Sequence, residues 1–375
     1  MMSAQTRNGA RMGEVKAIPG RPGRLGLGAF ALVVGLIGLP VGIGVGVMHV
    51  TKAGLSVPAA AGLVVLVCSL VLVVFGSVEL LRRLPKWWRL VSVPVALVLL
   101  QFYLLPVAPA VYATNLPPTE VGDATPADRG LAYEQVNFTT SDGVRLSGWY
   151  VPSANGAAVA LLHGSGSTRS AVLDHAEVLA GNGYGVLLYD DRGHGRSDGD
   201  GMDFGWWGDL DLGAAVSYLQ TRSDVLADRI GVVGMSMGGE QAVNAAATDD
   251  RILAVVGEGV EPRVPADTAL SPGPLGWVEQ TVNRIVVSSA ALLTDAPMPM
   301  PLRDAITAIA PRPVLLIAGS GEVEAIRDVT AGAPGTVEVW ELPDTPHTQG
   351  LADEPDQWEA RVVAFLDQAL APPGS

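Results

Sequence analysis

The chain of 375 residues is 49% hydrophobic and only 17% charged, so it is more apolar than an average soluble domain and a membrane part is expected. Residues 1–119 carry ten Lys/Arg and two Asp/Glu, whereas residues 120–375 carry 14 Arg, no Lys and 36 Asp/Glu. An acidic surface repels polyphosphate, which argues against nucleic-acid binding, and a single cysteine, Cys68, excludes an intrachain disulfide and a cysteine-based metal site.

Three stretches near the N-terminus contain no Asp, Glu, Lys or Arg. Each can supply the roughly 20 apolar residues that a helix needs to cross a bilayer. The predicted spans are 28–50, 57–80 and 90–112, after a basic tail over residues 1–27. The first apolar run is longer than the core of a cleaved signal peptide and two more runs follow it, which favours a retained, integral membrane anchor.

Basic residues beside the spans predict the orientation of the chain. They cluster before the first span and between the second and third, while only Lys52 lies between the first and second. With three crossings in the cell membrane, the amino terminus is cytoplasmic and residues 113–375 are extracytoplasmic; an even number would leave them in the cytoplasm. The first span also contains Gly42 and Gly46, whose spacing is typical of closely packed membrane helices, although 45 glycines give such spacings by chance.

Beyond a linker over residues 113–130, rich in Pro, Thr, Gly and Ala, apolar runs of strand length alternate with helical stretches. The predicted strands are 133–140, 144–151, 157–162, 185–189, 230–233, 252–256, 314–317 and 337–342. The predicted helices are near 169–182, 207–222, 236–247, 322–331 and 355–370. This alternation predicts one α/β domain over residues 131–375, with a mostly parallel sheet covered by helices on both faces.

A serine motif lies between one of these strands and the helix after it. The segment Gly234-Met-Ser236-Met-Gly238-Gly239 matches the G-x-S-x-G nucleophile elbow. A serine hydroxyl is a poor nucleophile unless it is exposed and oriented against a base, and a tight strand-to-helix turn achieves both. The motif alone is weak in a glycine-rich chain, but its strand and helix context predicts Ser236 as a nucleophile.

The base is expected to be a histidine that follows the serine in sequence, in the order Ser, acid, His. His347 is the histidine that does so, and it lies just after the strand 337–342. The acid is expected after the strand 314–317, where Glu322 lies, with Glu324 as the second choice and Glu258 as the third. A carboxylate there would fix the tautomer of the imidazole and stabilise its charged form.

An oxyanion hole needs two backbone N–H groups aimed at one point. The segment His163-Gly-Ser165-Gly166 ends the strand 157–162, and a turn there can direct an amide toward the amide of Met237. We therefore predict the amides of Ser165 and Met237 as the two donors, with Gly166 as an alternative to Ser165.

Taken together, these segments resemble the α/β-hydrolase superfamily, in particular its serine-hydrolase branch related to dienelactone hydrolases and prolyl oligopeptidase-like peptidases. The resemblance is carried by residues 138–152, 163–164, 189–197, 234–239, 311–319 and His347, within about 131–370. It implies an α/β-hydrolase fold, with nucleophile Ser236, base His347 and acid Glu322, and it implies no cofactor and no metal. A glutamate in place of the commoner aspartate and the membrane segment depart from the superfamily's common pattern.

An insert over about residues 259–310 lies where such hydrolases often place a lid. Its apolar residues recur at near-helical spacing, which predicts a helix. That helix could cover a pocket for an acyl chain, but packing on the body is the simpler arrangement and the one we expect.

The sequence thus predicts a membrane-anchored serine hydrolase that cleaves an ester, thioester or amide of a small molecule, lipid or peptide through an acyl-enzyme at Ser236. An acyltransferase with the same triad, or a non-catalytic binding protein on a hydrolase scaffold, remains an alternative. The substrate and the oligomeric state are not set by these motifs.

Overall fold

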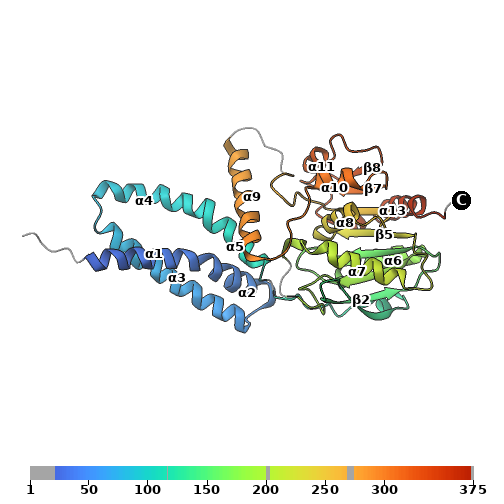
Figure 1. Ribbon diagram of the computed structural model, residues 1–375, viewed down its shortest axis with the longest axis horizontal. Coiled ribbons are helices and arrows are strands. Elements are labelled where there is room, and N and C mark those ends of the chain that lie inside the picture. The colour runs from blue at the N-terminus through green and yellow to red at the C-terminus, as the bar shows by residue number, and fades with distance from the viewer. Residues whose placement is uncertain (1–21, 116, 200–202, 268–273, 373–375) are drawn as a thin grey trace, which may run out of the picture.

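The computed structural model describes residues 22–115, 117–199, 203–267 and 274–372. The molecule is elongated, with long helices at one end and an α/β domain at the other (Figure 1). Most of the predicted basic tail, 1–27, lies outside the described residues.

Three helical runs, Gly26–Lys52, Val57–Leu81 and Lys86–Ala113, are long and apolar enough to cross a membrane. The three predicted spans are thus confirmed as apolar helices, each within a few residues. The elements are α1 (Pro22–Val41), a π-helical turn (Gly42–Val47) and α2 (Met48–Ala53) in the first run, α3 (Val57–Leu81) in the second, and α4 (Lys86–Leu99), a π-helical turn (Leu100–Leu104) and α5 (Leu105–Ala113) in the third.

Small residues bring the first and second runs together, backbone against backbone. A Cβ atom added at Gly42 would lie 2.5 Å from Leu66 Cα, and one at Gly46 would lie 2.8 Å from the carbonyl carbon of Gly62. These close contacts favour a packing role for the glycine pair over a chance spacing. In contrast, α4 contains no buried residue, and it diverges from α1 and α3 (Figure 1).

An eight-stranded sheet forms the centre of the C-terminal domain, in the order β1-β2-β4-β3-β5-β6-β7-β8. Strand β2 runs antiparallel to β1 and β4, and every other pair is parallel, which confirms the predicted, mostly parallel sheet. The strands are β1 (Glu134–Thr139), β2 (Arg145–Val151), β3 (Ala158–Leu162), β4 (Gly185–Asp190), β5 (Ile230–Met235), β6 (Ala254–Glu258), β7 (Val314–Ala318) and β8 (Val337–Glu341).

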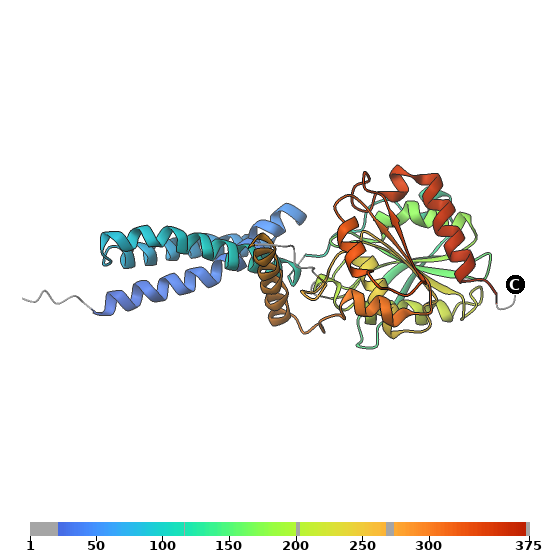
Figure 2. The same ribbon diagram turned by 90° about the horizontal axis from the view of Figure 1, so that it is seen from above.

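Helices cover both faces of this sheet, and Figure 2 shows the sheet between them. Apolar side chains of α7, α8 and α10 pack on one face, and those of α6 and α13 pack on the other. The helices are α6 (Leu173–Gly181), α7 (Gly208–Gln220), α8 (Met237–Thr248), α10 (Leu302–Ile309), α11 (Val323–Val329), α12 (Gly350–Asp353) and α13 (Pro355–Ala369). The central strands are buried on both faces, which explains their continuous apolar runs.

The insert forms a helix, α9 (Pro274–Leu293), as its spacing predicts. It runs across the long axis of the molecule, at the junction between the membrane helices and the α/β domain (Figures 1 and 2). Ala290 of α9 shares a small apolar cluster with Ala110 of α5 and Trp206 of the domain. The rings of Trp277 and Phe102 also meet edge to face, with centroids 6.0 Å apart. The helix therefore packs against the third membrane helix as well as against the body.

Candidate active site

Ser236 lies in a sharp turn between β5 and α8. Its backbone has φ 53° and ψ −122°, a region that residues other than glycine rarely adopt. The turn is held by hydrogen bonds, because the amide of Ser236 donates to the carbonyl of Glu258 at 2.7 Å and its carbonyl accepts from the amide of Gly239 at 2.8 Å. A Cβ atom added at Gly238 would lie 2.6 Å from Leu162 Cβ, so the turn has no room for a larger residue there. This is the geometry of a nucleophile elbow.

His347 lies in the loop between β8 and α12, and Glu322 lies just after β7. The Nδ1 atom of His347 is 2.5 Å from Oε1 of Glu322, while Oε2 of Glu322 accepts a hydrogen bond from the amide of Gly319 at 2.7 Å. Glu322 is buried, whereas 44% of the His347 side chain is exposed. Since Nδ1 is engaged by the carboxylate, Nε2 is the ring nitrogen that can serve a substrate.

The close approach of His347 to the sheet depends on Gly259, directly after β6. A Cβ atom added there would lie 2.8 Å from Cε1 of His347, and the φ of Gly259 is +69°. The absence of a side chain therefore lets the imidazole pack against this backbone. No sequence motif predicts this role of Gly259, because it depends on a contact between residues far apart in the chain.

The two other carboxylates considered for the acid have different surroundings. Glu258 accepts hydrogen bonds from the amide of Gly350 at 2.7 Å and from Nε1 of Trp358 at 2.9 Å. Burial raises the pKa of Glu258, and these two donors oppose the shift. Glu258 thus ties the segment that follows His347 to the end of β6. Glu324 is exposed in the first turn of α11, so Glu322 is the carboxylate that the structure joins to His347.

The amides predicted for the oxyanion hole lie on both sides of Ser236. Met237 is the first residue of α8, where backbone amides have no acceptor within the helix. The amide of Gly166, the alternative donor in the other turn, donates to Nε2 of His194 at 3.3 Å. Ser165, Ser236 and Met237 border one cavity, as an oxyanion hole requires.

Two buried histidines hold the turn that contains Ser165. His163 accepts a hydrogen bond from the amide of Asp191 at 3.1 Å, and its ring centroid is 4.9 Å from that of His194. Burial lowers the pKa of both imidazoles, that of His194 to about 4. Both rings are therefore neutral near pH 7 and can accept the hydrogen bonds that fix the turn. The motifs located both residues, but their supporting role depends on burial that the motifs do not reveal.

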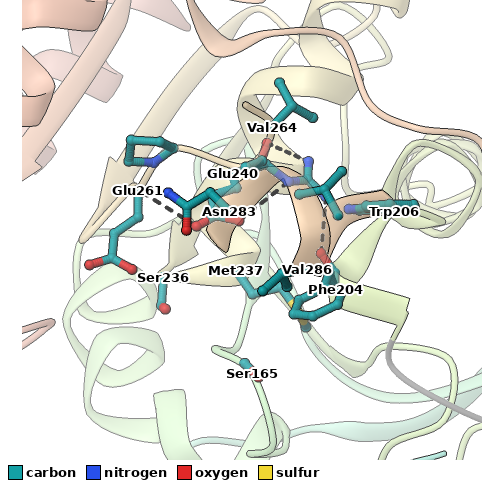
Figure 3. Close-up of a pocket in the computed structure, with 13 residues that line it drawn as sticks. Ser165, Phe204, Trp206, Ser236, Met237, Glu240, Glu261, Val264, Asn283 and Val286 are labelled. Carbon is teal, nitrogen blue, oxygen red and sulfur yellow. Dashed lines mark hydrogen bonds and ion pairs between the residues drawn. The ribbon is translucent and has the colours of Figure 1, made fainter. Parts of the chain in front are cut away.

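Ser236 borders two cavities. The first, named the α9 cavity, has a volume of about 270 Å³, and the second, named the His347 cavity, has a volume of about 620 Å³. The α9 cavity is lined by Ser165, Phe204, Trp206, Ser236, Met237, Glu240, Glu261, Pro262, Arg263, Val264, Asn283, Val286 and Val287 (Figure 3). The His347 cavity shares Ser165 and Ser236 with it and extends past His347 toward α6 and α12.

Comparison with known proteins supports the α/β fold described above for the C-terminal domain. The model of the family described as serine aminopeptidase, S33, matches residues 153–298. The Pyrococcus furiosus esterase Pf2001 has a TM-score of 0.56 and 29% sequence identity, over 68% of this chain and 98% of the esterase. The C-terminal domain belongs to the α/β-hydrolase superfamily. Two curated relatives of the hydrolase domain are YfhR of Escherichia coli O157:H7, with 27% identity over 64% of this chain and 82% of YfhR, and the thiohydrolase aneE of Aspergillus aculeatus, with 34% identity over 33% of this chain and 40% of aneE.

Charged residues form part of the α9 cavity of this hydrolase. Nε of Arg263 lies 3.3 Å from Oε2 of Glu240, and its Nη2 donates to the carbonyl of Gly205 at 2.8 Å. Burial raises the pKa of Glu240 to about 7, although Arg263 opposes this shift. Glu261 is exposed, and in Figure 3 its carboxylate lies on the same side of the cavity as Ser236. No local motif marks Glu240 as part of this cavity, because its partner Arg263 lies 23 positions away in the chain.

Proposed function

We propose that the protein is a membrane-anchored serine hydrolase that cleaves an ester, thioester or amide through an acyl-enzyme. Ser236 is the nucleophile, His347 the base and Glu322 the acid. The observation that carries the proposal is the Glu322–His347 hydrogen bond beside the elbow serine, since Ser236 and His347 border the same cavity. The similarity to an esterase and to a protein named as a thiohydrolase favours ester or thioester substrates over amides.

The chemistry follows from this arrangement in two steps. His347 Nε2 takes the proton from Ser236 Oγ as that oxygen bonds to the carbonyl carbon, and the Ser165 and Met237 amides stabilise the negative oxygen of the tetrahedral intermediate. The bond to the leaving group then breaks, and His347 gives its proton to the leaving oxygen, sulfur or nitrogen. Water attacks the acyl-serine with the same base, releasing the carboxylic acid and restoring Ser236. Glu322 keeps the imidazole oriented and stabilises its positive charge.

The three apolar helices would anchor this domain in the membrane, and the basic clusters favour a cytoplasmic amino terminus. Three crossings then place the hydrolase domain outside the cell membrane. The orientation rests on charge distribution and on the number of apolar helices.

One labelling experiment tests both the Ser236 nucleophile and the orientation of the hydrolase domain. Intact cells that express the protein are treated with a membrane-impermeant fluorophosphonate, and lysed cells receive the same probe. We expect labelling of the wild type in both samples, none of Ser236→Ala, and normal labelling of a control, Ser217→Ala, which lies on α7. Labelling only after lysis would contradict the orientation. No labelling in either sample would contradict the nucleophile and favour a binding protein on a hydrolase scaffold.

An acyltransferase would label in the same way, so product analysis must separate it from a hydrolase. The purified protein is incubated with an ester and increasing concentrations of an alcohol acceptor. We expect the free acid as the main product throughout. A transferred ester as the main product at low acceptor concentration would identify a transferase.

A further inference from the structure

The two cavities beside Ser236 have different surroundings. These surroundings indicate which cavity holds the leaving group of a substrate and which holds its acyl group. The leaving group must receive its proton from His347, so it must lie within hydrogen-bonding reach of that imidazole, in the His347 cavity. The acyl group then extends into the α9 cavity. The apolar lining of this cavity comes from Val286 and Val287 of α9 and from Phe204 and Met237 of the domain, beside the polar side chains of Glu240, Glu261, Arg263 and Asn283.

The acyl side of the site adjoins the third membrane helix directly. Met237, next to the nucleophile, shares an apolar cluster with Ala113, the last residue of α5, and Phe204 packs against the same cluster. Val287 of α9 lines the cavity and also packs against the cluster that contains Ala110. A wall of the α9 cavity is thus continuous with the end of an apolar helix long enough to span a bilayer.

The position of α9 suits a helix that lies in the surface of a bilayer. It runs crosswise to the membrane helices at their junction with the domain (Figures 1 and 2). Several of its apolar side chains are largely exposed: Leu275 is 81% exposed, Leu292 is 87% exposed, and Trp277 is 59% exposed although its ring contacts Phe102. Helices at an interface bury such residues at the boundary between lipid headgroups and acyl chains, where tryptophan is also favoured.

We propose that α9 lies in the bilayer surface and, with the end of the third membrane helix, forms an entrance through which a membrane-resident amphiphile inserts its acyl chain toward Ser236. The substrate class is therefore a long-chain acyl ester or thioester held in the bilayer. This inference rests on the proposed function, because it requires the membrane anchor and the Ser236 nucleophile.

Two esters with one leaving group test the inference. The full chain is reconstituted in phosphatidylcholine nanodiscs and supplied with 4-methylumbelliferyl oleate in the disc or 4-methylumbelliferyl butyrate in water. The double variant Leu275→Ser/Leu292→Ser changes two exposed side chains of α9 that do not line the cavity. We expect its kcat/KM for the oleate ester to fall at least tenfold, while the value for the butyrate ester stays within twofold. The control Leu226→Ser changes an exposed leucine of the hydrolase domain and should alter neither.

A second measurement reports on α9 without using catalysis. Brominated phosphatidylcholine quenches tryptophan that lies within the bilayer, and the contribution of Trp277 is the difference between the wild type and Trp277→Phe. We expect the brominated lipid to reduce this fluorescence contribution of Trp277. Lack of quenching, or equal loss of both ester activities in the double variant, would overturn the inference. If neither ester is hydrolysed by the wild type and the fluorophosphonate fails to label Ser236, the proposed function fails instead, and the quenching still decides whether α9 lies in the bilayer.

Discussion

In the membrane helices the closest contacts are between backbones, whereas in the hydrolase domain buried charges make the decisive contacts. Gly46, in the π-helical turn of the first membrane helix, allows that turn to approach Gly62 of α3, as small residues do where no water competes for the backbone. In the domain, Arg169 and Asp190 form a fully buried ion pair at 3.1 Å. Such a pair stabilises a fold only when its geometry and hydrogen bonds are complete. Steric fit thus sets the packing of the membrane helices, while the hydrolase domain combines steric fit, at Gly238 and Gly259, with buried polar pairs.

The two regions meet at the turn that holds the predicted oxyanion donor. Lys52, at the end of the first membrane helix, donates a hydrogen bond to the carbonyl of Gly166. Thr119 of the linker donates to the same carbonyl at 3.0 Å. The first membrane helix and the linker therefore contact the turn that contains Ser165 directly. Substitutions in either region test whether the two regions act independently.

The largest effect on activity is expected from Glu322→Gln in the hydrolase domain, which should lower kcat. The side-chain oxygen of glutamine can still accept the hydrogen bond from the backbone amide of Gly319. The neutral side chain cannot, however, stabilise the positive charge of a protonated His347. The equivalent change in serine proteases lowers kcat by about 10⁴-fold, and we expect a loss of about 10³ to 10⁴-fold. Ester hydrolysis by the purified full chain measures it. Glu324→Gln, two residues away and exposed, is the matched control and should keep its activity. A greater loss of kcat in a folded Glu258→Gln protein would instead make Glu258 the acid.

The polar interior of the domain also predicts a dependence of stability on pH. Burial, together with the negative charge of the neighbouring Asp211, raises the pKa of Asp191 from 3.8 to about 7. Because the folded value exceeds the unfolded one, the stability contributed by this group is complete below about pH 4 and is lost as the pH rises through 7. The loss is at most about 4 kcal/mol, since each pKa unit is worth about 1.4 kcal/mol.

The variant Asp191→Asn should lack this component of the pH dependence. Its free energy of unfolding, measured by denaturant in detergent, should fall less than that of the wild type between pH 4 and pH 8. Asp344→Asn, at an exposed loop position, should follow the wild type. Parallel curves for the wild type and Asp191→Asn would show that Asp191 does not titrate with folding.

The same contrast explains what the sequence could predict. The membrane spans, the alternating strands and helices, and the serine elbow are local patterns of apolar spacing and turn residues, so they are visible in one chain. The sequence favoured Glu322 over Glu324 and Glu258, but it could not show which carboxylate contacts His347, because all three lie at or just beyond the ends of neighbouring strands. The pairing of Glu240 with Arg263, and the packing of α9 on α5, depend on contacts between distant segments, which no local pattern encodes.

A smaller effect on activity is expected from Gly259→Ala. The added methyl group would lie 2.8 Å from both Cε1 of His347 and Cγ2 of Thr348, so the imidazole must move. Displacing a catalytic group by about 1 Å can cost about 10²-fold, and we expect a fall in kcat of that order. Gly332→Ala is the matched control, because Gly332 has a similar φ of +79° but nothing within 4 Å of the added atom. Equal activity in the two variants would show that His347 does not depend on this close contact.

The smallest effect on catalysis, and a direct test of the comparison, is expected from Gly46→Leu in the first membrane helix. The new side chain has no space beside Gly62, so the first and second membrane helices must separate there. Overpacking of this kind costs about 1–3 kcal/mol, which should lower the midpoint of thermal unfolding in detergent. Gly26→Leu is the control, since nothing lies within 4 Å of a Cβ atom there. Hydrolysis of 4-methylumbelliferyl butyrate should stay within twofold in both variants, because the hydrogen bonds around Ser236 and His347 come from the domain itself. A large loss of that activity in Gly46→Leu alone would mean that packing in the membrane reaches the oxyanion turn through Lys52, and that the two regions are not independent.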